Sequence, residues 1–151
     1  AVDQGSYASK LPARFEIVSR NPLIFIDGAH NEAKMKFLAS QLRAYGTRRV
    51  KLVIAMAGNK EFKRVLAAID SLVDCYFLTR FSNPFRKHWD LAFAKQFIEK
   101  NFGKKAHAFI LPEVALEKAL SSGNAKMPIV VTGSFFLCGD LRNYLKKCVS
   151  G

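Results

Sequence analysis

The stretch Leu23-Ile24-Phe25-Ile26-Asp27-Gly28-Ala29-His30-Asn31 decides the fold, because four apolar residues lead directly into polar ones and then into a helical pattern. Such an apolar run predicts a buried strand. Ligands of α/β proteins bind at the carboxyl ends of strands, and Gly28 allows the backbone to approach one closely. Asp27, His30 and Asn31 are therefore candidate binding residues. The alternative is an ordinary strand-to-helix turn capped by Asp27 or Asn31.

The residues on either side alternate between strand and helix patterns. A strand at 15–19 is joined to the one at 23–26 by Asn21-Pro22, a gap too short for a parallel crossover, so these two strands pair antiparallel or lie in different layers. Further strands are expected at 50–55, 75–78, 108–110 and 129–131, and helices at 31–45, 61–69, 85–100, 114–120 and 137–147. This order predicts an α/β fold: a three-layer, Rossmann-like, mostly parallel sheet with one antiparallel strand and helices on both faces.

Apolar residues at helical spacing predict the inward face of each long helix. The expected inward residues are Ala33, Phe37, Leu38 and Leu42; Phe62, Val65, Leu66 and Ile69; Phe85, Trp89, Ala92, Phe93 and Phe97; and Leu141, Tyr144, Leu145 and Cys148. Gly46 and Gly103 are expected to end the helices before them. Cys75, Cys138 and Cys148 lie in apolar stretches and are interpreted as small core residues.

Length and composition predict one domain with a substantial core, since the chain has 151 residues and half are hydrophobic. We expect this domain at 11–151, after a polar linker at 1–10 without a signal peptide, and we expect the chain to be a piece of something longer. No apolar run reaches the roughly 18 residues of a membrane helix. An odd cysteine count without a CxxC pair is typical of a reducing cytoplasm.

The net charge of +12 favours anionic partners such as nucleotides, polyanionic metabolites or nucleic acid. The basic residues are nevertheless scattered, and the adjacent pairs are isolated: Arg48-Arg49, Lys104-Lys105 and Lys146-Lys147. This scatter favours solvated surface charge over a nucleic-acid interface. The three histidines lie far apart in the sequence, so no metal site is predicted.

Five loops that follow strands should share one rim of the sheet: 27–31, 57–61, 79–86, 111–113 and 132–134. Lys60 precedes a helix and could meet a phosphate, or it could simply be exposed. Thr132-Gly133-Ser134 opens the last helix and could bind a carboxylate or phosphate, or it could only cap that helix. The sequence has no GxxxxGK[ST] motif and no GxGxxG after a strand, so the chain lacks the usual elements for holding a nucleoside triphosphate.

Three motifs together resemble a known family. Leu11-Pro12-Ala13-Arg14-Phe15-Glu16, Asp27-Gly28-Ala29-His30-Asn31 and Thr132-Gly133-Ser134-Phe135-Phe136-Leu137 are similar to blocks in the C-terminal domain of folylpolyglutamate synthase/dihydrofolate synthase, a relative of the Mur ligases. The order and spacing match from Leu11 onward. There are two departures: Ala13 replaces a glycine, and Asn59-Lys60-Glu61 replaces a DKD loop.

The resemblance implies an ATP-dependent ligase that adds L-glutamate to folate or dihydropteroate through an acyl phosphate. It also implies that the phosphate loop, most of the Mg²⁺ ligands and much of the pterin site belong to an N-terminal P-loop ATPase domain of the same polypeptide. This chain would be the closing half of a monomeric enzyme and would be inactive alone.

The resemblance also implies roles for individual residues. Catalytic roles near the phosphoryl group would fall to His30, as a donor, and to Lys60. Nucleotide contacts would come from Arg14, Asp27 and Asn31, with Asp27 alternatively orienting His30 and Arg14 alternatively pairing with Glu16. The incoming glutamate would be bound by Ser134, with Thr132 supporting the loop. Arg86, in Ser82-Asn83-Pro84-Phe85-Arg86, loosely matches an amino-acid-binding segment of Mur ligases, although Phe85 shifts the register.

Three other interpretations stay open: a non-catalytic nucleotide-binding module of the same fold, a diverged Mur-type amino-acid ligase domain, and a basic nucleic-acid binder. The polar cluster at the strand ends favours the ligase or the nucleotide-binding module over the nucleic-acid binder.

Overall fold

The computed structural model describes residues 13–58 and 61–150, so the expected linker at 1–10 and Lys60 lie outside the described residues. The strands are β1 (Glu16–Arg20), β2 (Leu23–Asp27), β3 (Val50–Ile54), β4 (Val73–Leu78), β5 (Ala106–Ala108) and β6 (Ile129–Thr132). The helices are α2 (Glu32–Tyr45), α3 (Phe62–Ile69), α4 (Leu91–Phe102), α5 (Pro112–Ser121) and α6 (Phe135–Ser150), with a short 3-10 helix at Asp70–Leu72.

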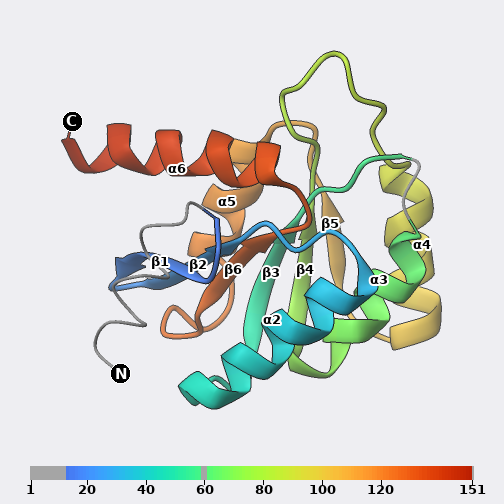
Figure 1. Cartoon of the computed structure of the whole chain (residues 1–151), viewed down its shortest axis with the longest axis horizontal. Helices are drawn as coiled ribbons and strands as arrows, with labels where there is room; N and C mark the ends of the chain where they lie inside the picture. The colour runs from blue at the N-terminus through green and yellow to red at the C-terminus, as the bar shows by residue number, and fades with distance from the viewer. Residues whose placement is uncertain (1–12, 59–60, 151) are drawn as a thin grey trace.

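The strands form a single sheet in the order β1-β2-β6-β3-β4-β5 (Figure 1). β1 and β2 pair antiparallel, and every other neighbouring pair is parallel. This confirms the predicted fold, including the single antiparallel strand. The carboxyl ends of β2, β3, β4, β5 and β6 therefore lie along one edge of the sheet, where the loops that follow them can meet.

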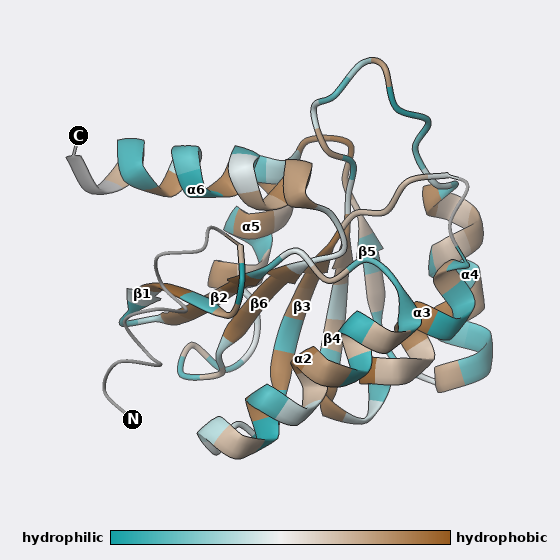
Figure 2. Cartoon of the chain, viewed as in Figure 1, coloured by the Kyte–Doolittle hydropathy of each residue, from teal (hydrophilic) through white to brown (hydrophobic). Residues whose placement is uncertain are grey.

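Two apolar clusters lie on the two faces of the sheet. One cluster packs α2, α3 and α4 against residues such as Phe25, Leu52 and Tyr76, and the other packs α5 and α6 against residues such as Ile26 and Phe77. Successive strand residues contribute to opposite clusters because side chains alternate across a sheet. Figure 2 shows the resulting hydrophobic strands between helices whose outer surfaces are hydrophilic.

Helix α2 confirms its expected ends but not its whole inward face. Its N-cap is Asn31, and Gly46 ends it in the left-handed conformation. The buried residues are Met35, Leu38, Ala39 and Leu42, whereas Phe37 is 65% exposed and Ala33 is also exposed. The spacing 35, 38, 39 and 42 is itself an ideal helical stripe. The expectation for Phe37 was wrong because positions 33, 37, 38 and 42 also recur at helical spacing, so periodicity alone did not select the stripe that packs on the sheet.

The helix expected at 85–100 begins later, at α4, where the Asp90 carboxylate accepts a hydrogen bond from the Phe93 amide at 3.0 Å. The residues before it form an irregular loop, and Phe85 is 94% exposed. Trp89 is buried as expected, but from the loop, where its indole N–H donates to the Thr79 carbonyl at 2.9 Å. The buried helix residues are Ala94 and Ile98; Ala92 and Phe93 face outward and Phe97 is half-buried. Asp90 is a stronger start signal than the apolar residues upstream of it.

The remaining expectations differ in smaller ways. The stripe of α3 is buried or half-buried as predicted, and β5 is a three-residue edge strand that begins two residues earlier than expected. Cys138 is buried and Cys75 is half-buried, but Cys148 is exposed, so its assignment to the core was wrong. It lies in the last turn of α6, where the preceding residues Lys146 and Lys147 are exposed as well.

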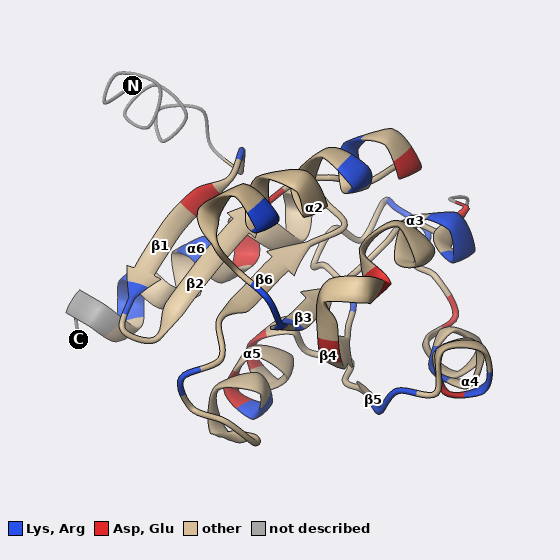
Figure 3. Ribbon diagram, turned by 90° about the horizontal axis from the view of Figure 1, so that it is seen from below, with Lys and Arg blue, Asp and Glu red and all other residues tan. Residues whose placement is uncertain are grey.

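Charged residues are distributed over several elements. Figure 3 shows lysines and arginines on the helices, strand ends and loops, with acidic residues among them. Within the described residues, no helix combines the length and the apolar character needed to cross a membrane.

Candidate functional site

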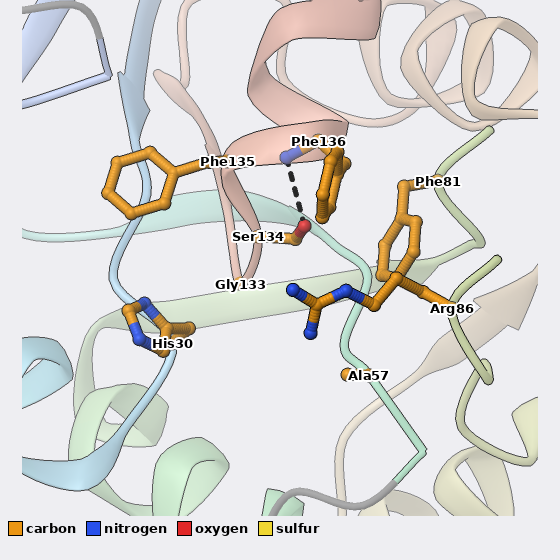
Figure 4. Close-up of a pocket in the computed structure, with 8 residues that line it drawn as sticks. All are labelled: His30, Ala57, Phe81, Arg86, Gly133, Ser134, Phe135 and Phe136. Atoms are coloured by element: carbon orange, nitrogen blue, oxygen red, sulfur yellow. Dashed lines mark hydrogen bonds between the residues drawn. The ribbon is translucent and has the colours of Figure 1, made fainter. Parts of the chain in front are cut away.

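A cavity of about 230 Å³ opens where the loops after β2, β3, β4 and β6 meet (Figure 4). Its lining residues are His30, Ala57, Phe81, Arg86, Gly133, Ser134, Phe135 and Phe136. Four of the five loops predicted to share the rim therefore contribute to one cavity. Figure 4 shows His30 and Arg86 on opposite sides of it, with Ser134 and Phe136 at the start of α6.

Asp27 organises the loop after β2 through its two carboxylate oxygens. Oδ2 accepts a hydrogen bond from the Phe15 amide and Oδ1 accepts one from the Ala29 amide, each at 2.8 Å. Burial raises the pKa of Asp27, and these hydrogen bonds together with the nearby charge of Arg14 oppose that rise without cancelling it. The carboxylate is thus occupied by backbone groups, and neither of its hydrogen bonds goes to His30.

His30 lies at the cavity wall and is held by its own loop. Its Nδ1 is 3.1 Å from the Gly28 carbonyl oxygen, and its ring centroid is 5.8 Å from that of Phe135. A carbonyl oxygen only accepts, so Nδ1 carries the proton and Nε2 is the ring atom left for a ligand. In the neutral ring Nε2 accepts a hydrogen bond, and in the imidazolium it donates one to an anion.

The loop after β6 crosses the loop after β2 at close range. The Gly133 amide donates to the Ala29 carbonyl at 3.0 Å, and the Thr132 hydroxyl donates to the same carbonyl at 3.4 Å. Gly133 has φ +103°, and a Cβ there would lie 2.4 Å from the carbonyl oxygen of Ala55. Glycine is therefore required at position 133, both for its backbone conformation and because the residue lies against Ala55, directly after β3.

Ser134 combines a capping contact with a place in the cavity wall. Its hydroxyl accepts a hydrogen bond from the Phe136 amide at 3.0 Å at the start of α6, and the residue is 7% exposed. The helix-capping alternative from the sequence therefore describes a real contact, but it does not exclude a ligand because a hydroxyl can also donate. Thr132 is fully buried and does not line the cavity; it supports the loop through its hydroxyl, which donates to the Ala29 carbonyl.

Arg86 reaches the cavity from the irregular loop between β4 and α4. Its guanidinium carbon lies 5.6 Å from the centre of the Phe136 ring, a cation–π arrangement. The loop is anchored to α6 where the amide and hydroxyl of Ser82 donate to Asp140, at 2.9 and 2.6 Å. The Gly58 amide also donates to the Lys87 carbonyl at 2.7 Å, which ties this loop to the one after β3.

The other predicted residues lie around the cavity rather than in its wall. Arg14 is exposed, and the alternative that it pairs with Glu16 was wrong, because Glu16 pairs with Arg142 instead. Asn31 caps α2 by accepting from the Lys34 amide at 2.8 Å. The described residues contain no group of three His, Cys, Asp or Glu side chains that could hold a metal ion.

The sequence interpretation missed the aromatic part of the wall, which consists of Phe81, Phe135 and Phe136. The rings of Phe81 and Phe136 are 5.4 Å apart. Phe135 packs over Gly28, where a Cβ would lie 2.4 Å from its ring. The sequence did hold a signal, since two adjacent aromatic residues, Phe135 and Phe136, directly follow Ser134. In the structure they are 47% and 41% exposed at the first turn of α6.

Comparison with known proteins assigns this arrangement to a family. The family model described as "Mur ligase, glutamate ligase domain" matches residues 13–135, which carry every strand and the whole cavity wall except Phe136. The chain belongs to this Mur ligase family.

Individual members of the family resemble the chain over nearly its whole length. The dihydrofolate synthase/folylpolyglutamate synthase of Escherichia coli is 30% identical over 157 residues, which cover 100% of this chain and 34% of that enzyme. The structure of Mycobacterium tuberculosis folylpolyglutamate synthase with ADP and AMPPCP matches with a TM-score of 0.79 at 26% identity, covering 89% of this chain and 32% of that one.

A bifunctional folylpolyglutamate synthase/dihydrofolate synthase with Mn, AMPPNP and L-glutamate bound matches with a TM-score of 0.73 at 25% identity, covering 90% of this chain and 32% of that one. The chain thus spans about a third of the length of these relatives.

Within this Mur ligase domain, the cavity offers a specific set of groups to a ligand. Arg86 supplies a fixed positive charge, His30 supplies a ring nitrogen that can gain a proton, and Ser134 supplies a hydroxyl. Phe81 and Phe136 cover part of the wall with apolar surface. Such a combination suits a small anion that also carries an aliphatic part.

Proposed function

We propose that this chain is the C-terminal domain of a cytoplasmic, monomeric, ATP-dependent ligase that adds L-glutamate to folate or dihydropteroate. The observation that carries the proposal is the cavity shared by His30, Arg86 and Ser134 at the strand ends of a Mur ligase domain. It is further supported by the relatives, which are named as folylpolyglutamate and dihydrofolate synthases.

The reaction proceeds in two steps. The γ-phosphoryl group of ATP passes to the terminal carboxylate of the pterin substrate, giving ADP and an acyl phosphate. The amine nitrogen of glutamate then attacks the acyl carbon, the bond from that carbon to the phosphate oxygen breaks, and the nitrogen loses a proton, giving an amide and phosphate. Both steps need positive groups around the phosphoryl oxygens, and the second needs water excluded.

His30 and Arg14 serve the phosphoryl group in this proposal. His30, as the imidazolium, donates from Nε2 to a phosphoryl oxygen while Nδ1 stays bonded to the Gly28 carbonyl. Arg14, exposed at the edge of the domain, contacts the ATP phosphates. Lys60 adds positive charge in the same role. Asp27 acts mainly through the backbone amides that it holds, and Asn31 faces the nucleotide from the cap of α2.

Arg86 and Ser134 serve the incoming glutamate. A guanidinium binds a carboxylate through two parallel hydrogen bonds, which fixes its orientation. Ser134 contributes a hydroxyl, and Thr132 holds the loop. The phenyl rings of Phe81 and Phe136 contact the aliphatic part of the amino acid and keep water away from the acyl phosphate.

An N-terminal P-loop ATPase domain of the same polypeptide supplies the remaining parts. Mg²⁺ would neutralise the phosphate oxygens and would be held mainly by that domain. One relative binds AMPPNP together with Mn. The isolated chain is inactive in this proposal.

The proposal is tested by ADP release from the full-length parent protein with ATP, Mg²⁺, dihydropteroate or folate, and glutamate. Turnover should require both glutamate and the pterin. His30→Ala should lower it at least roughly 100-fold, which corresponds to about 2.7 kcal/mol of barrier. His107→Ala is the matched control, because His107 is exposed on β5 and does not line the cavity.

Other outcomes separate the alternatives. Turnover that needs the pterin and glutamate but is unchanged in His30→Ala would support the ligase proposal and overturn the role of His30 in the site. Turnover with another acid and amino acid would indicate a diverged Mur-type ligase. Nucleotide binding without any turnover would indicate a non-catalytic module.

A further inference from the structure

Arg14 sits in a turn that L-amino acids rarely adopt. The residues on both sides of it have left-handed backbone conformations, with φ +61° at Ala13 and φ +47° at Phe15. Each such residue is strained, because its Cβ crowds the adjacent carbonyl oxygen. Strained residues persist only where surrounding contacts fix them, and they concentrate at functional sites. Two sets of contacts fix this turn.

One set of contacts fixes the turn to β2. The Gly28 amide donates to the Ala13 carbonyl at 2.7 Å, and the Phe15 amide donates to Asp27 at 2.8 Å. The Phe15 ring stacks on Phe25 with centroids 5.0 Å apart. These contacts place the turn directly beside the loop that carries His30.

A second set of contacts fixes the turn to α6. The Ala13 amide donates to Glu16 Oε1 at 3.1 Å, and the same carboxylate is held by Arg142 through Nη2 at 2.7 Å and Nε at 3.3 Å. The side chains of Arg142 and Glu16 are only 19% and 18% exposed. An ion pair with two hydrogen bonds and this degree of burial holds its geometry far better than an exposed one.

The charge state of Glu16 agrees with this role. Burial alone would raise its pKa, but the hydrogen bonds from Arg142 and Ala13 and the charges of Arg142 and Lys146 outweigh burial, so the pKa is lowered. The carboxylate is therefore ionised at neutral pH and accepts from both the turn and the helix.

We infer that Glu16 and Arg142 are positioning residues that hold the strained turn and so place Arg14 for its contact with the ATP phosphates. The inference rests on the proposed function, which gives Arg14 that contact. Because Arg142 occupies the carboxylate, Glu16 is not the ion-pair partner of Arg14, whose exposed side chain is left for a ligand. Neither Glu16 nor Arg142 touches the substrate.

The test measures the dissociation constant of AMPPNP with Mg²⁺ for the full-length parent protein by calorimetry. Arg142→Gln should weaken binding about 10-fold or more, as expected for loss of a charge-assisted hydrogen bond to phosphate. Arg142→Lys should recover part of this loss. Lys147→Gln is the matched control, since Lys147 is an exposed cation on the same helix, and it should bind like the wild type.

A second background separates positioning from general loss of structure. In the Arg14→Ala variant, Arg142→Gln should cause no further loss of affinity, because the side chain that it positions is already gone. An equal loss in both backgrounds, or no loss in either, would overturn the inference. Thermal unfolding checks the fold, and Glu16→Gln, which keeps an acceptor for the Ala13 amide, carries the test if Arg142→Gln does not fold.

Turnover measured in parallel keeps the two proposals apart. Suppose that Arg142→Gln weakens nucleotide binding only when Arg14 is present, and that no glutamate-dependent turnover is found. This result would support the positioning role and overturn the ligase. Glutamate-dependent turnover, together with a nucleotide affinity that does not change in Arg142→Gln, would support the ligase and overturn the positioning role. A parent protein that binds no nucleotide would overturn both.

Discussion

Single polar residues at the rim of the sheet carry two tasks, one in the fold and one that remains for a ligand. Ser134 accepts from the Phe136 amide and still offers a hydroxyl proton to the cavity. His30 uses Nδ1 on the Gly28 carbonyl and leaves Nε2. Asp27 differs, because both of its oxygens are taken by amides. A structural hydrogen bond and a ligand contact are therefore compatible for Ser134 and for His30, whereas Asp27 acts chiefly by shaping the loop.

Asp27→Asn tests whether the Asp27 carboxylate shapes the loop after β2. The amide can accept from only one of the two backbone N–H groups and turns a donor toward the other, so at neutral pH the free energy of unfolding should fall by about 1–3 kcal/mol. Urea unfolding of the chain measures it. Asp74→Asn, at an exposed position on β4, should change it by less than about 0.5 kcal/mol.

The pH dependence of that difference has a definite sign. Burial raises the pKa of Asp27 above its ordinary value of 3.8, so the folded protein holds this proton more tightly than the unfolded chain. The proton-linked part of the Asp27 contribution to stability is therefore greatest below that value and is lost as pH rises through the raised pKa, whereas the hydrogen bonds from the Phe15 and Ala29 amides remain. The stability gap between wild type and Asp27→Asn should narrow over that rise, and a gap that widens would contradict the assignment.

At the scale of elements, the site depends on how closely two loops and one helix start approach each other. In the loop after β6, the Gly133 amide donates to Ala29 in the loop after β2, and Gly133 lies against the Ala55 carbonyl directly after β3; α6 then starts with Phe135 over Gly28. The loop after β4 is held to α6 through Asp140. Small residues at the crossings set the distance between the elements, so the cavity is a product of their packing.

A pair of glycine substitutions measures this packing. Gly133→Ala places a Cβ 2.4 Å from a carbonyl oxygen at φ +103°, and it should destabilise the chain by roughly 3 kcal/mol or more. Gly139→Ala lies in α6 with nothing within 4 Å of the new Cβ, and it should stabilise by roughly 0.5–1 kcal/mol through helix propensity. Thermal unfolding compares the two variants, and equal effects would contradict the close contact between Gly133 and the Ala55 carbonyl.

In the molecule as a whole, the candidate ligand-binding groups lie along one edge of the sheet. The sequence of this chain has no phosphate-binding loop. The cavity has cationic, hydroxyl and aromatic groups from four loops, and Arg14 lies exposed beside the antiparallel β1–β2 pair. A site of this kind is completed by a second surface that faces the same edge. The proposed ATPase domain provides that surface.

The isolated chain should therefore bind nucleotide poorly. We expect a dissociation constant for ADP with Mg²⁺ on the order of millimolar, corresponding to about 4 kcal/mol of binding free energy, and much tighter binding by the full-length parent. Calorimetry on the two proteins makes the comparison. Micromolar binding by the isolated chain would instead favour the free-standing nucleotide-binding module.

The amino-acid sequence alone predicts the order of strands and helices along the chain, the single antiparallel strand, and the loops that meet at the rim. These features depend on local periodicity and on chain length between strands, which are written into neighbouring residues. It also placed Asp27, His30, Arg86 and Ser134 in those loops. Their roles toward ATP and glutamate stay predictions, and Lys60 lies outside the described residues.

Which side chains meet depends on the packing of the folded chain. The folded chain pairs Glu16 with Arg142 across 126 positions, sets Phe135 on Gly28 and leaves Phe85 exposed. Local patterns could not settle these contacts, because an ion pair, a ring contact or an exposed aromatic depends on the packing of elements distant in sequence. The fold class follows from periodicity, whereas the site follows from packing.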